Sequence, residues 1–348
     1  MKIKRLPVYI LTGFLGSGKT TFLRYLLRNT KNRFAVIVNE FGEIGLDGQL
    51  VQNCNFCDVN HVNDYLIELN NGCICCTVQE DFLPTMKKLI NISNKIDGII
   101  IETSGLALPT PLIKALSWPD VRSSCYLDSV ITLINGESFA KHNKPIESLK
   151  LHDQQKDNKY LEHYSSIEEL FSNQLSASDV VIISRSDLIN NHQFELIREN
   201  LITKLNRDIP VLKSYNGNSK LDFIFGSNLQ SHDKSKTISE DHSHLKVYSE
   251  SIRLEYFHNK KELDKLLPSL ILDLEIIRLK GRCWIPGKNL PLQIQMVGSK
   301  INTWFEEASD ECWKPSSGGG IDIVLITFQK NASHLLTKKI KEKFKVIY

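Results

Sequence analysis

The sequence predicts an α/β protein in which a doubly wound, mostly parallel sheet is followed by a second, smaller α+β domain. Three observations support this fold class. Short apolar runs alternate with helical patterns in the N-terminal part, a glycine-rich motif directly follows the first run, and a polar stretch precedes a region of alternating strands. Strands that alternate with helices need crossover connections, which favour a parallel sheet covered on both faces.

The strands expected in the first domain are short, β-rich and apolar, as in sheets that are buried on both faces. They lie at residues 8–11, 35–38, 98–101, 129–134 and 180–184. Helical patterns fill the intervals, for example at residues 20–28 and 81–92. This alternation predicts βαβ units with right-handed crossovers, joined into one sheet.

Domain boundaries follow from local composition. We place the first domain at residues 1–217, a polar linker at 218–245 and the α+β domain at 246–348. Residues 140–164 are also polar, and we expect them to form an inserted loop. The second domain is expected to contain strands at 247–256, 276–285, 292–297 and 321–328, and helices at 260–270 and 332–344.

Bulk composition excludes some functions. The chain has 348 residues, of which 41% are hydrophobic and 24% charged, as expected of a soluble protein with room for two domains. A formal net charge of +3 gives no reason to expect nucleic acid or an acidic membrane as a partner. The first apolar run ends at once in GSGKTT without a cleavage site, and no run approaches the roughly 18 apolar residues of a membrane span. We therefore expect a cytoplasmic protein.

The glycine-rich motif is a phosphate-binding loop. Residues 13–20, GFLGSGKT, fit G-x-x-x-x-G-K-[ST] between a predicted strand and a predicted helix, which is the context that the motif requires. Backbone N–H groups and the helix N-terminus favour bound phosphates, Lys19 contacts the β- and γ-phosphates, and the Thr20 hydroxyl binds Mg²⁺. The residues predicted to bind nucleotide here are Gly13, Gly16, Ser17, Gly18, Lys19, Thr20 and Thr21.

A carboxylate follows the apolar run at residues 98–101. Glu102 stands where the second nucleotide motif places its acid, and we expect it to hold Mg²⁺ or the water bound to it. The N–H group of Gly105 is expected close to the γ-phosphate. The alternative is a strand that simply ends in a solvated glutamate.

A base-reading motif follows the strand at residues 180–184. GTPases place Asn-Lys-x-Asp here, and the aspartate accepts hydrogen bonds from two guanine nitrogens. Asp187 retains this acceptor, and the guanidinium plane of Arg185 can stack on the base as a lysine would. Because Ser184 replaces the asparagine, GTP is favoured over ATP but not decisively.

The cysteines are concentrated in one segment, since five of the eight fall within residues 54–76. The sequence NNGCICCT carries three thiols, those of Cys73, Cys75 and Cys76. Three thiolates from one loop form one face of a tetrahedral site for Zn²⁺, Co²⁺ or Cu⁺, and the open fourth position makes the metal exchangeable. Buried or redox-active cysteines are the alternative. The pair Cys54 and Cys57 fits an auxiliary ligand, a redox pair or a plain loop equally well.

A sensor segment is expected upstream of the cysteines. Residues 39–47, NEFGEIGLD, follow the second strand, where GTPases keep the mobile segment that responds to the γ-phosphate. Glu43 or Asp47 is expected to face Mg²⁺ or the thiol-bound metal. The predicted catalytic residues are Lys19, Glu102 and Glu43, and the predicted metal ligands are Cys73, Cys75, Cys76, Thr20 and Glu102.

The segments GFLGSGKTT, NEFGEIGLD, ELNNGCICCTV and IIIETSGLALP together resemble the CobW-type metal-chaperone P-loop GTPases. SWPDVRS, IEELFSNQLSASDVV and IIRLKGRCWIPGK extend the likeness to the CobW branch associated with cobalamin biosynthesis, over residues 6–300. The resemblance implies a GTPase that binds GTP and Mg²⁺, acquires Co²⁺ or Zn²⁺ at the cysteines in the GTP-bound state and delivers it on hydrolysis. The implied partner is a metal-receiving client, which for this branch is cobalt chelatase.

Other functions remain open at this point. A zinc-allocating chaperone has the same chemistry and a different client. A small-molecule kinase with a structural zinc predicts an acceptor pocket and a preference for ATP, and a redox module predicts a disulfide on mild oxidation. Neither explains why a sensor-like segment precedes the cysteines. The oligomeric state is equally open between a monomer and a nucleotide-dependent dimer.

Overall fold

The structure is a computed structural model that divides the chain into two compact units, Met1–Arg207 with Val211–Leu221 and Asp208–Pro210 with Asp222–Tyr348. It describes residues 5–30, 32–38, 66–68, 82–142, 167–215, 225, 236–237, 248–255, 261, 265, 274, 276–297, 300–308, 312–327 and 329–343. Two predicted elements, the sensor segment at 39–47 and most of the helix at 260–270, lie outside these residues.

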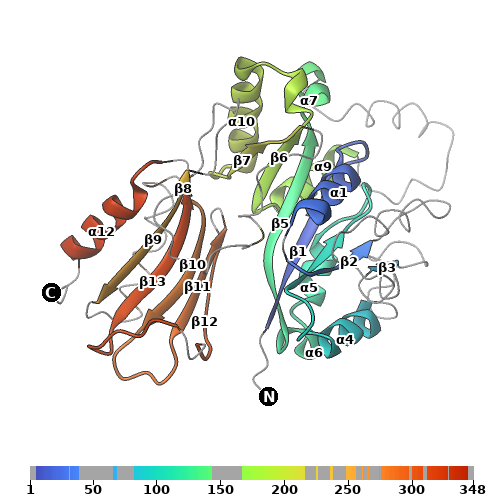
Figure 1. Ribbon diagram of the computed structural model, residues 1–348. Helices are drawn as coiled ribbons and strands as arrows, with labels where there is room; N and C mark the ends of the chain where they lie inside the picture. The colour runs from blue at the N-terminus through green and yellow to red at the C-terminus, as the bar shows by residue number, and fades with distance from the viewer. Residues whose placement is uncertain are drawn as a thin grey trace. The chain divides into compact units, whose positions relative to one another are not determined.

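The first unit is built on a parallel sheet. Seven strands of the described residues are hydrogen-bonded in the order β3-β2-β4-β1-β5-β6-β7, and every neighbouring pair is parallel. The strands are β1 (Leu6–Thr12), β2 (Phe34–Val38), β3 (Leu66–Glu68), β4 (Gly98–Glu102), β5 (Cys125–Asn135), β6 (Val180–Ser184) and β7 (Val211–Lys213). Figure 1 shows β1 and β5 side by side in the middle of this sheet. The predicted doubly wound α/β fold is confirmed.

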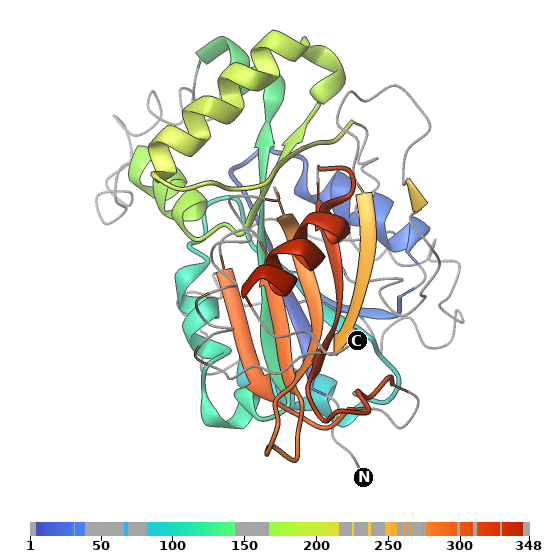
Figure 2. The same cartoon turned by 90° about the vertical axis from the view of Figure 1, so that its left-hand side faces the viewer.

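Helices cover both faces of this sheet, as its crossover connections require. They are α1 (Lys19–Asn29), α4 (Leu83–Asn91), α5 (Thr110–Ala115), α6 (Pro119–Arg122), α7 (Gly136–His142), α9 (Ile167–Ser176) and α10 (Asn191–Leu205), with a 3₁₀ turn η4 (Ser186–Leu188). In Figure 2, α1 and α5 lie on opposite sides of the sheet. The turn from β1 into α1 and the ends of β4 and β6 therefore meet at one edge of the sheet, the carboxyl edge.

The core of the first unit is apolar on both faces of the strands. β1 and β4 are buried at every position. Met86 of α4, Leu112 of α5 and Val121 of α6 pack in one cluster with Ile10 and Ile101. Because the strands present apolar side chains alternately to each face, they read as continuous apolar runs in the sequence. This packing fixes the strand ends that carry the polar residues described below.

As far as its residues are described, the second unit is an antiparallel sheet with helix α12 packed on it. Its strand order is β12-β11-β10-β13-β9-β8 among the described residues. The elements are β8 (Lys236–Thr237), β9 (Tyr248–Glu255), β10 (Ile276–Trp284), β11 (Leu292–Val297), β12 (Lys300–Phe305), β13 (Gly320–Thr327) and α12 (Ala332–Lys343). The smaller α+β domain is thus confirmed as a fold. β8 falls within residues 218–245, the segment predicted to be a linker.

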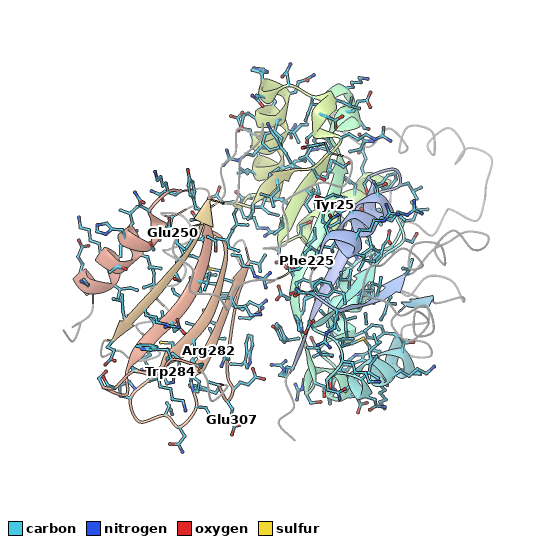
Figure 3. The ribbon with its side chains drawn as sticks, viewed as in Figure 1. Tyr25, Phe225, Glu250, Arg282, Trp284 and Glu307 are labelled. Atoms are coloured by element: carbon cyan, nitrogen blue, oxygen red, sulfur yellow. The ribbon has the colours of Figure 1, made fainter. Side chains whose placement is uncertain are left out.

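Helix α12 is held to this sheet at its side and at its start. Ala332, Leu336 and Ile340 are spaced four residues apart, which places them on one face of the helix, and all three are fully buried in the core of the unit. Glu250 of β9, labelled in Figure 3, accepts hydrogen bonds from the backbone N–H groups of Asn331 and Ser333 at 2.8 and 2.6 Å. A carboxylate at a helix N-terminus satisfies backbone donors that have no partner inside the helix. No helix among the described residues is long and apolar enough to cross a membrane.

Candidate nucleotide site

The phosphate loop turns sharply between β1 and α1. Gly13, Gly16 and Gly18 have φ angles of 139°, 68° and 91°, a conformation that favours glycine. A Cβ atom on Gly13 would lie 2.3 Å from the carbonyl oxygen of Leu133, so a side chain at this position would collide with β5. The loop that the sequence predicts is therefore built from glycines because its backbone demands them.

Lys19 is the first residue of α1, and its ammonium group lies back across the loop. Nζ donates to the carbonyl oxygens of Gly13 and Phe14 at 2.9 and 3.3 Å, and the residue is 9% exposed. Ser17 is 2% exposed, and its Oγ has no hydrogen-bond partner among the described residues. A buried cation and a buried hydroxyl at the N-terminus of an eleven-residue helix fit a phosphate group. Thr21 lies one position beyond Thr20 on α1 and is exposed.

The fold brings together Thr20, in the first turn of α1, and Glu102, the last residue of β4. The hydroxyl of Thr20 donates to Oε1 of Glu102 at 3.1 Å, and Glu102 is 5% exposed at the end of β4. Glu102 is therefore not the solvated strand end that was the alternative prediction. A hydroxyl and a carboxylate are hard oxygen ligands of the kind that Mg²⁺ prefers, so this pair fits a magnesium ion that also contacts phosphates.

The loop after β4 lies directly against the phosphate loop. A Cβ atom on Gly105 would stand 2.7 Å from the backbone nitrogen of Leu15. Thr103 anchors the start of this loop. Its N–H donates to the carbonyl oxygen of Leu11, and its hydroxyl donates to the hydroxyl oxygen of Thr12, both at 2.9 Å. Gly105 is thus placed where only a residue without a side chain fits, beside the turn predicted to hold the phosphates.

Asn135 also contacts the phosphate loop, and sequence reasoning missed it. It is the last residue of β5, it is 9% exposed, and its Nδ2 donates to the carbonyl oxygen of Gly16 at 3.3 Å. Its Oδ1 accepts the backbone N–H of Ser138 in α7 at 3.1 Å. The feature that identified Glu102, a polar residue that ends a buried strand, marks Asn135 as well.

The base-reading residues lie in the turn after β6. Arg185 has a φ angle of 51°, and both Arg185 and Asp187 are exposed. Arg185 Nη1 is 3.6 Å from Oε2 of Glu137, the second residue of α7. Lys141 and, more weakly, Arg185 lower the pKa of Glu137 by hydrogen bonding and charge. A carboxylate that stays ionised therefore lies beside the guanidinium predicted to stack on the base.

Three backbone and side-chain contacts fix the position of this turn. The hydroxyl of Ser184 donates to the carbonyl oxygen of Ile134 at 3.2 Å. The N–H of Ser186 donates to the carbonyl oxygen of Ser214 at 3.1 Å, and the N–H of Ser214 donates to that of Ile183 at 2.8 Å. Ser214 directly follows β7, so the turn is held between the ends of β5 and β7. Sequence reasoning did not find this second support, because β7 has only three residues.

The predicted metal ligands other than Thr20 and Glu102 lie outside the described residues. These are Cys73, Cys75 and Cys76; the predicted catalytic residue Glu43 of the sensor segment also lies outside the described residues. Within the described part of the chain, no group of three or more histidine, cysteine or acidic residues is arranged to hold a metal ion. Cys125 and Cys312 are free thiols, and burial raises the pKa of the Cys125 thiol to about 12.

Comparison with known proteins agrees with the two units. Residues 7–213 match the family model described as CobW/HypB/UreG, nucleotide-binding domain, and residues 249–345 match the cobalamin synthesis protein CobW C-terminal domain. A zinc chaperone CobW of Sinorhizobium is 36% identical over 340 residues, which are 92% of each chain. A zinc chaperone CobW of Pseudomonas aeruginosa is also 36% identical, over 87% of this chain and 84% of its own.

Among solved structures, the zinc-bound YjiA GTPase of Escherichia coli aligns with 97% of this chain and 99% of its own, at 20% identity and a TM-score of 0.40. The matched nucleotide-binding domain covers more than half of the chain and contains the phosphate loop, the Thr20–Glu102 pair and the turn at Asp187. The chain is therefore a P-loop GTPase that belongs to the CobW/HypB/UreG family.

Proposed function

We propose that this GTPase is a metallochaperone whose cargo is Zn²⁺, held by the thiolates of Cys73, Cys75 and Cys76 and released to a client protein when GTP is hydrolysed. Thiolates are ligands that zinc prefers, and three of them leave one coordination position open for exchange. The names of the Sinorhizobium and Pseudomonas relatives, both zinc chaperones, support zinc as the cargo.

The observation that carries this proposal is the alignment of strand ends in the first sheet. Val38 of β2 pairs with Glu68 of β3 on one side and with Glu102 of β4 on the other. Because the three strands are parallel, their carboxyl ends lie at one level on one edge of the sheet. In the sequence, the sensor segment continues from β2 and the cysteine segment continues from β3. β2 and β3, the strands that these two segments follow in the sequence, therefore end at the edge where the phosphate loop lies.

The roles proposed for the nucleotide site follow from its geometry. When bound, Mg²⁺ supplies positive charge that offsets the charge of the phosphates. Thr20 and Glu102 would hold that ion, and Lys19 would exchange its two backbone acceptors for the β- and γ-phosphates. The N–H of Gly105 would donate to the γ-phosphate, while Arg185 stacks on the base and Asp187 accepts from guanine. The N–H groups of Gly13, Gly16, Ser17, Gly18, Thr20 and Thr21 complete the proposed nucleotide contacts.

Nucleotide and cargo must be energetically coupled for such a chaperone to work. In our proposal GTP orders the sensor segment at residues 39–47, including Glu43, and this raises the affinity of the neighbouring cysteines for the metal. Loss of the γ-phosphate relaxes the segment and lowers that affinity. Coupling between two sites is reciprocal, so bound metal must equally raise the affinity for GTP over GDP.

Cobalt is the second candidate cargo, with cobalt chelatase as its client. Segments such as SWPDVRS and IIRLKGRCWIPGK favour it, because they extend the likeness to the branch associated with cobalamin biosynthesis. A simple thiolate site nevertheless binds Zn²⁺ more tightly than Co²⁺, as the Irving–Williams order requires. Selection of cobalt would need a geometry that works against this order, and zinc needs none. A zinc enzyme is therefore the client class that we propose.

The test is a set of metal affinities of the full chain, measured by competition with a chromophoric chelator. Zn²⁺ and Co²⁺ are titrated with Mg²⁺ and a non-hydrolysable GTP analogue, with Mg²⁺ and GDP, and without nucleotide. We expect the tightest binding with the GTP analogue and tighter binding of Zn²⁺ than of Co²⁺. Equal affinities in the three states would overturn the coupling, and tighter Co²⁺ binding would replace zinc by cobalt.

Two cysteine variants make this test specific. Cys75→Ala should abolish nucleotide-dependent metal binding while the affinity for GTP is retained. Cys312→Ala is the matched control, because Cys312 is a free cysteine in the second unit and should leave metal binding unchanged. A loss of metal binding in the control variant would place the site elsewhere.

A further inference from the structure

A glutamine of α9 is buried at the nucleotide edge of the first sheet, and no motif accounts for it. Gln174 is fully buried, and its Nε2 donates to the carbonyl oxygens of Gly105 and Ala107, both at 3.0 Å. Both acceptors belong to the loop that follows β4 and lies against the phosphate loop. One side chain from a distant helix thus holds both ends of a three-residue stretch of this loop.

The orientation of this amide is fixed by its partners. Carbonyl oxygens only accept hydrogen bonds, so the atom that faces Gly105 and Ala107 must be the nitrogen with its two hydrogens. The other amide atom, Oε1, is buried and has no hydrogen-bond partner among the described residues. A buried acceptor without a partner is costly. Gln174 therefore stabilises the core less than an apolar residue would. Its two donated hydrogen bonds are the contacts that account for a glutamine at this buried position.

Gln174 stands on a rigid support. The C-terminal end of α9 is tied to β5, because the hydroxyls of Ser178 and Thr132 are 2.5 Å apart and both residues are fully buried. Next to them, Oδ2 of Asp179 accepts the backbone N–H of Val130 at 2.8 Å. β5 in turn pairs with β1, the strand that leads into the phosphate loop. Groups that must be held accurately are best placed on such rigid elements.

The loop that Gln174 holds is packed against the phosphate loop on its opposite side. Gly105 is pressed against the backbone of Leu15, where even a Cβ atom would be 2.7 Å from the nitrogen. The phosphate loop thus limits movement in one direction, and the amide of Gln174 limits it in the other. Together they hold the backbone at Gly105 in place beside the phosphate loop.

We propose that Gln174 is a positioning residue for GTP hydrolysis, which acts through the carbonyl groups of Gly105 and Ala107 to aim the Gly105 N–H at the γ-phosphate. The proposal rests on the proposed role of Gly105. Gln174 touches neither substrate nor metal, and its effect is confined to nucleotides that carry a γ-phosphate. GDP, which lacks this group, gains nothing from the position of the loop.

The test compares kinetics and affinities of the full chain carrying Gln174→Met, which removes both donors at nearly constant volume. We expect kcat for GTP to fall about tenfold, equivalent to about 1.4 kcal/mol, because a misplaced donor loses only part of the roughly 100-fold or more that its complete removal costs. The affinity for a non-hydrolysable GTP analogue should fall about as much, while that for GDP is unchanged. Gln174→Glu, which turns the donor into an acceptor, should lower kcat further.

A structural role would give a different pattern. Leu175→Ala is the matched control, because Leu175 is a buried apolar residue that follows Gln174 on the same helix. This variant should lower the melting temperature and leave the ratio of GTP-analogue to GDP affinity unchanged. If Gln174→Met weakens both nucleotides equally, or changes only the melting temperature, the proposal is wrong.

A third variant separates this proposal from the function on which it rests. Gly105→Ala places a methyl group against Leu15 and must displace the loop. If Gly105→Ala lowers the affinity ratio and Gln174→Met does not, Gln174 is not a positioning residue and the role of Gly105 stands. If neither variant lowers the ratio, the role of Gly105 is wrong, and the proposal for Gln174 is overturned with it.

Discussion

Replacement of Asn135 by alanine should weaken the binding of GDP and GTP equally. This residue joins the end of β5 to the phosphate loop through the bond from Nδ2 to the Gly16 carbonyl at 3.3 Å, and to α7 through the bond from Ser138 at 3.1 Å. Gly16 belongs to the part of the loop that we expect to hold the phosphates common to both nucleotides. Its displacement therefore cannot discriminate between them, in contrast to the loop held by Gln174.

The magnitude follows from the two hydrogen bonds that are lost. A neutral hydrogen bond contributes about 0.5–1.5 kcal/mol net, and the 3.3 Å bond to Gly16 is long, so we assign it about 0.7 kcal/mol. This value alone corresponds to a loss of roughly threefold in nucleotide affinity. The bond to Ser138 fixes the start of α7 and adds a loss of about 1 kcal/mol in the free energy of unfolding.

The assay is a fluorescence titration of Asn135→Ala with labelled GDP and with a labelled GTP analogue, together with thermal unfolding without nucleotide. Asn173→Ala is the matched control, because Asn173 is an exposed asparagine on α9. Unchanged affinities for both nucleotides would refute the reasoning, and so would a loss confined to the GTP analogue.

Three further predictions test other parts of the molecule. Thr20→Ala removes the side-chain oxygen of one of the two residues at the predicted magnesium site. The Mg²⁺ concentration for half-maximal GTP hydrolysis should therefore rise about tenfold, which corresponds to a loss of about 1.4 kcal/mol in binding free energy. Thr203→Ala, at an exposed threonine, should leave that concentration unchanged. Hydrogen bonds from Ser316 and Ser317 lower the pKa of Glu255 to about 2. The ionised form therefore stabilises the fold at pH values above the ordinary pKa of a carboxyl group, and this stabilisation is lost as the pH falls toward 2. The difference in melting temperature between the wild type and Glu255→Gln should accordingly shrink between pH 4.5 and pH 2, and a constant difference would contradict the assignment. Leu336→Ala should lower the free energy of unfolding of the second unit by about 2–5 kcal/mol in chemical denaturation, because the fully buried side chain leaves a cavity between α12 and the sheet.

Most strands of the first sheet could be predicted because they are buried on both faces. The run at residues 180–184 coincides with β6, and β1, β2 and β4 differ from their predicted bounds by two residues or fewer at each end. β3 and β7 were missed, since three residues are too short for any periodic pattern. Each is recruited by pairing with a longer neighbour, β2 or β6, which is a tertiary effect. The start of α10 could also have been predicted from the sequence, because Asn190 and Gln193 form a capping box, but it was overlooked.

The residues of the candidate site likewise fall into two groups, those that the sequence predicts and those that only the structure reveals. Lys19, Thr20, Glu102 and Asp187 were predicted because a motif fixes their spacing or because they end a buried run. Asn135 and Gln174 were not, since their roles depend on contacts with residues 119 and 69 positions away in the chain. A single sequence carries no record of such contacts, and only the fold brings the partners together.

The unusual residue of the base-reading turn, Ser184, illustrates how the fold redistributes a role. Its hydroxyl donates to the carbonyl oxygen of Ile134, and its side chain lies beside the phosphate loop, where a Cβ atom on Gly18 would be 3.5 Å from Ser184 Cβ. The hydrogen bond to that loop comes from Asn135, on the neighbouring strand. With a short residue at position 184 the turn is still supported from β5, and we expect the carboxylate of Asp187 to select guanine. On this reasoning the serine does not by itself weaken the preference for GTP.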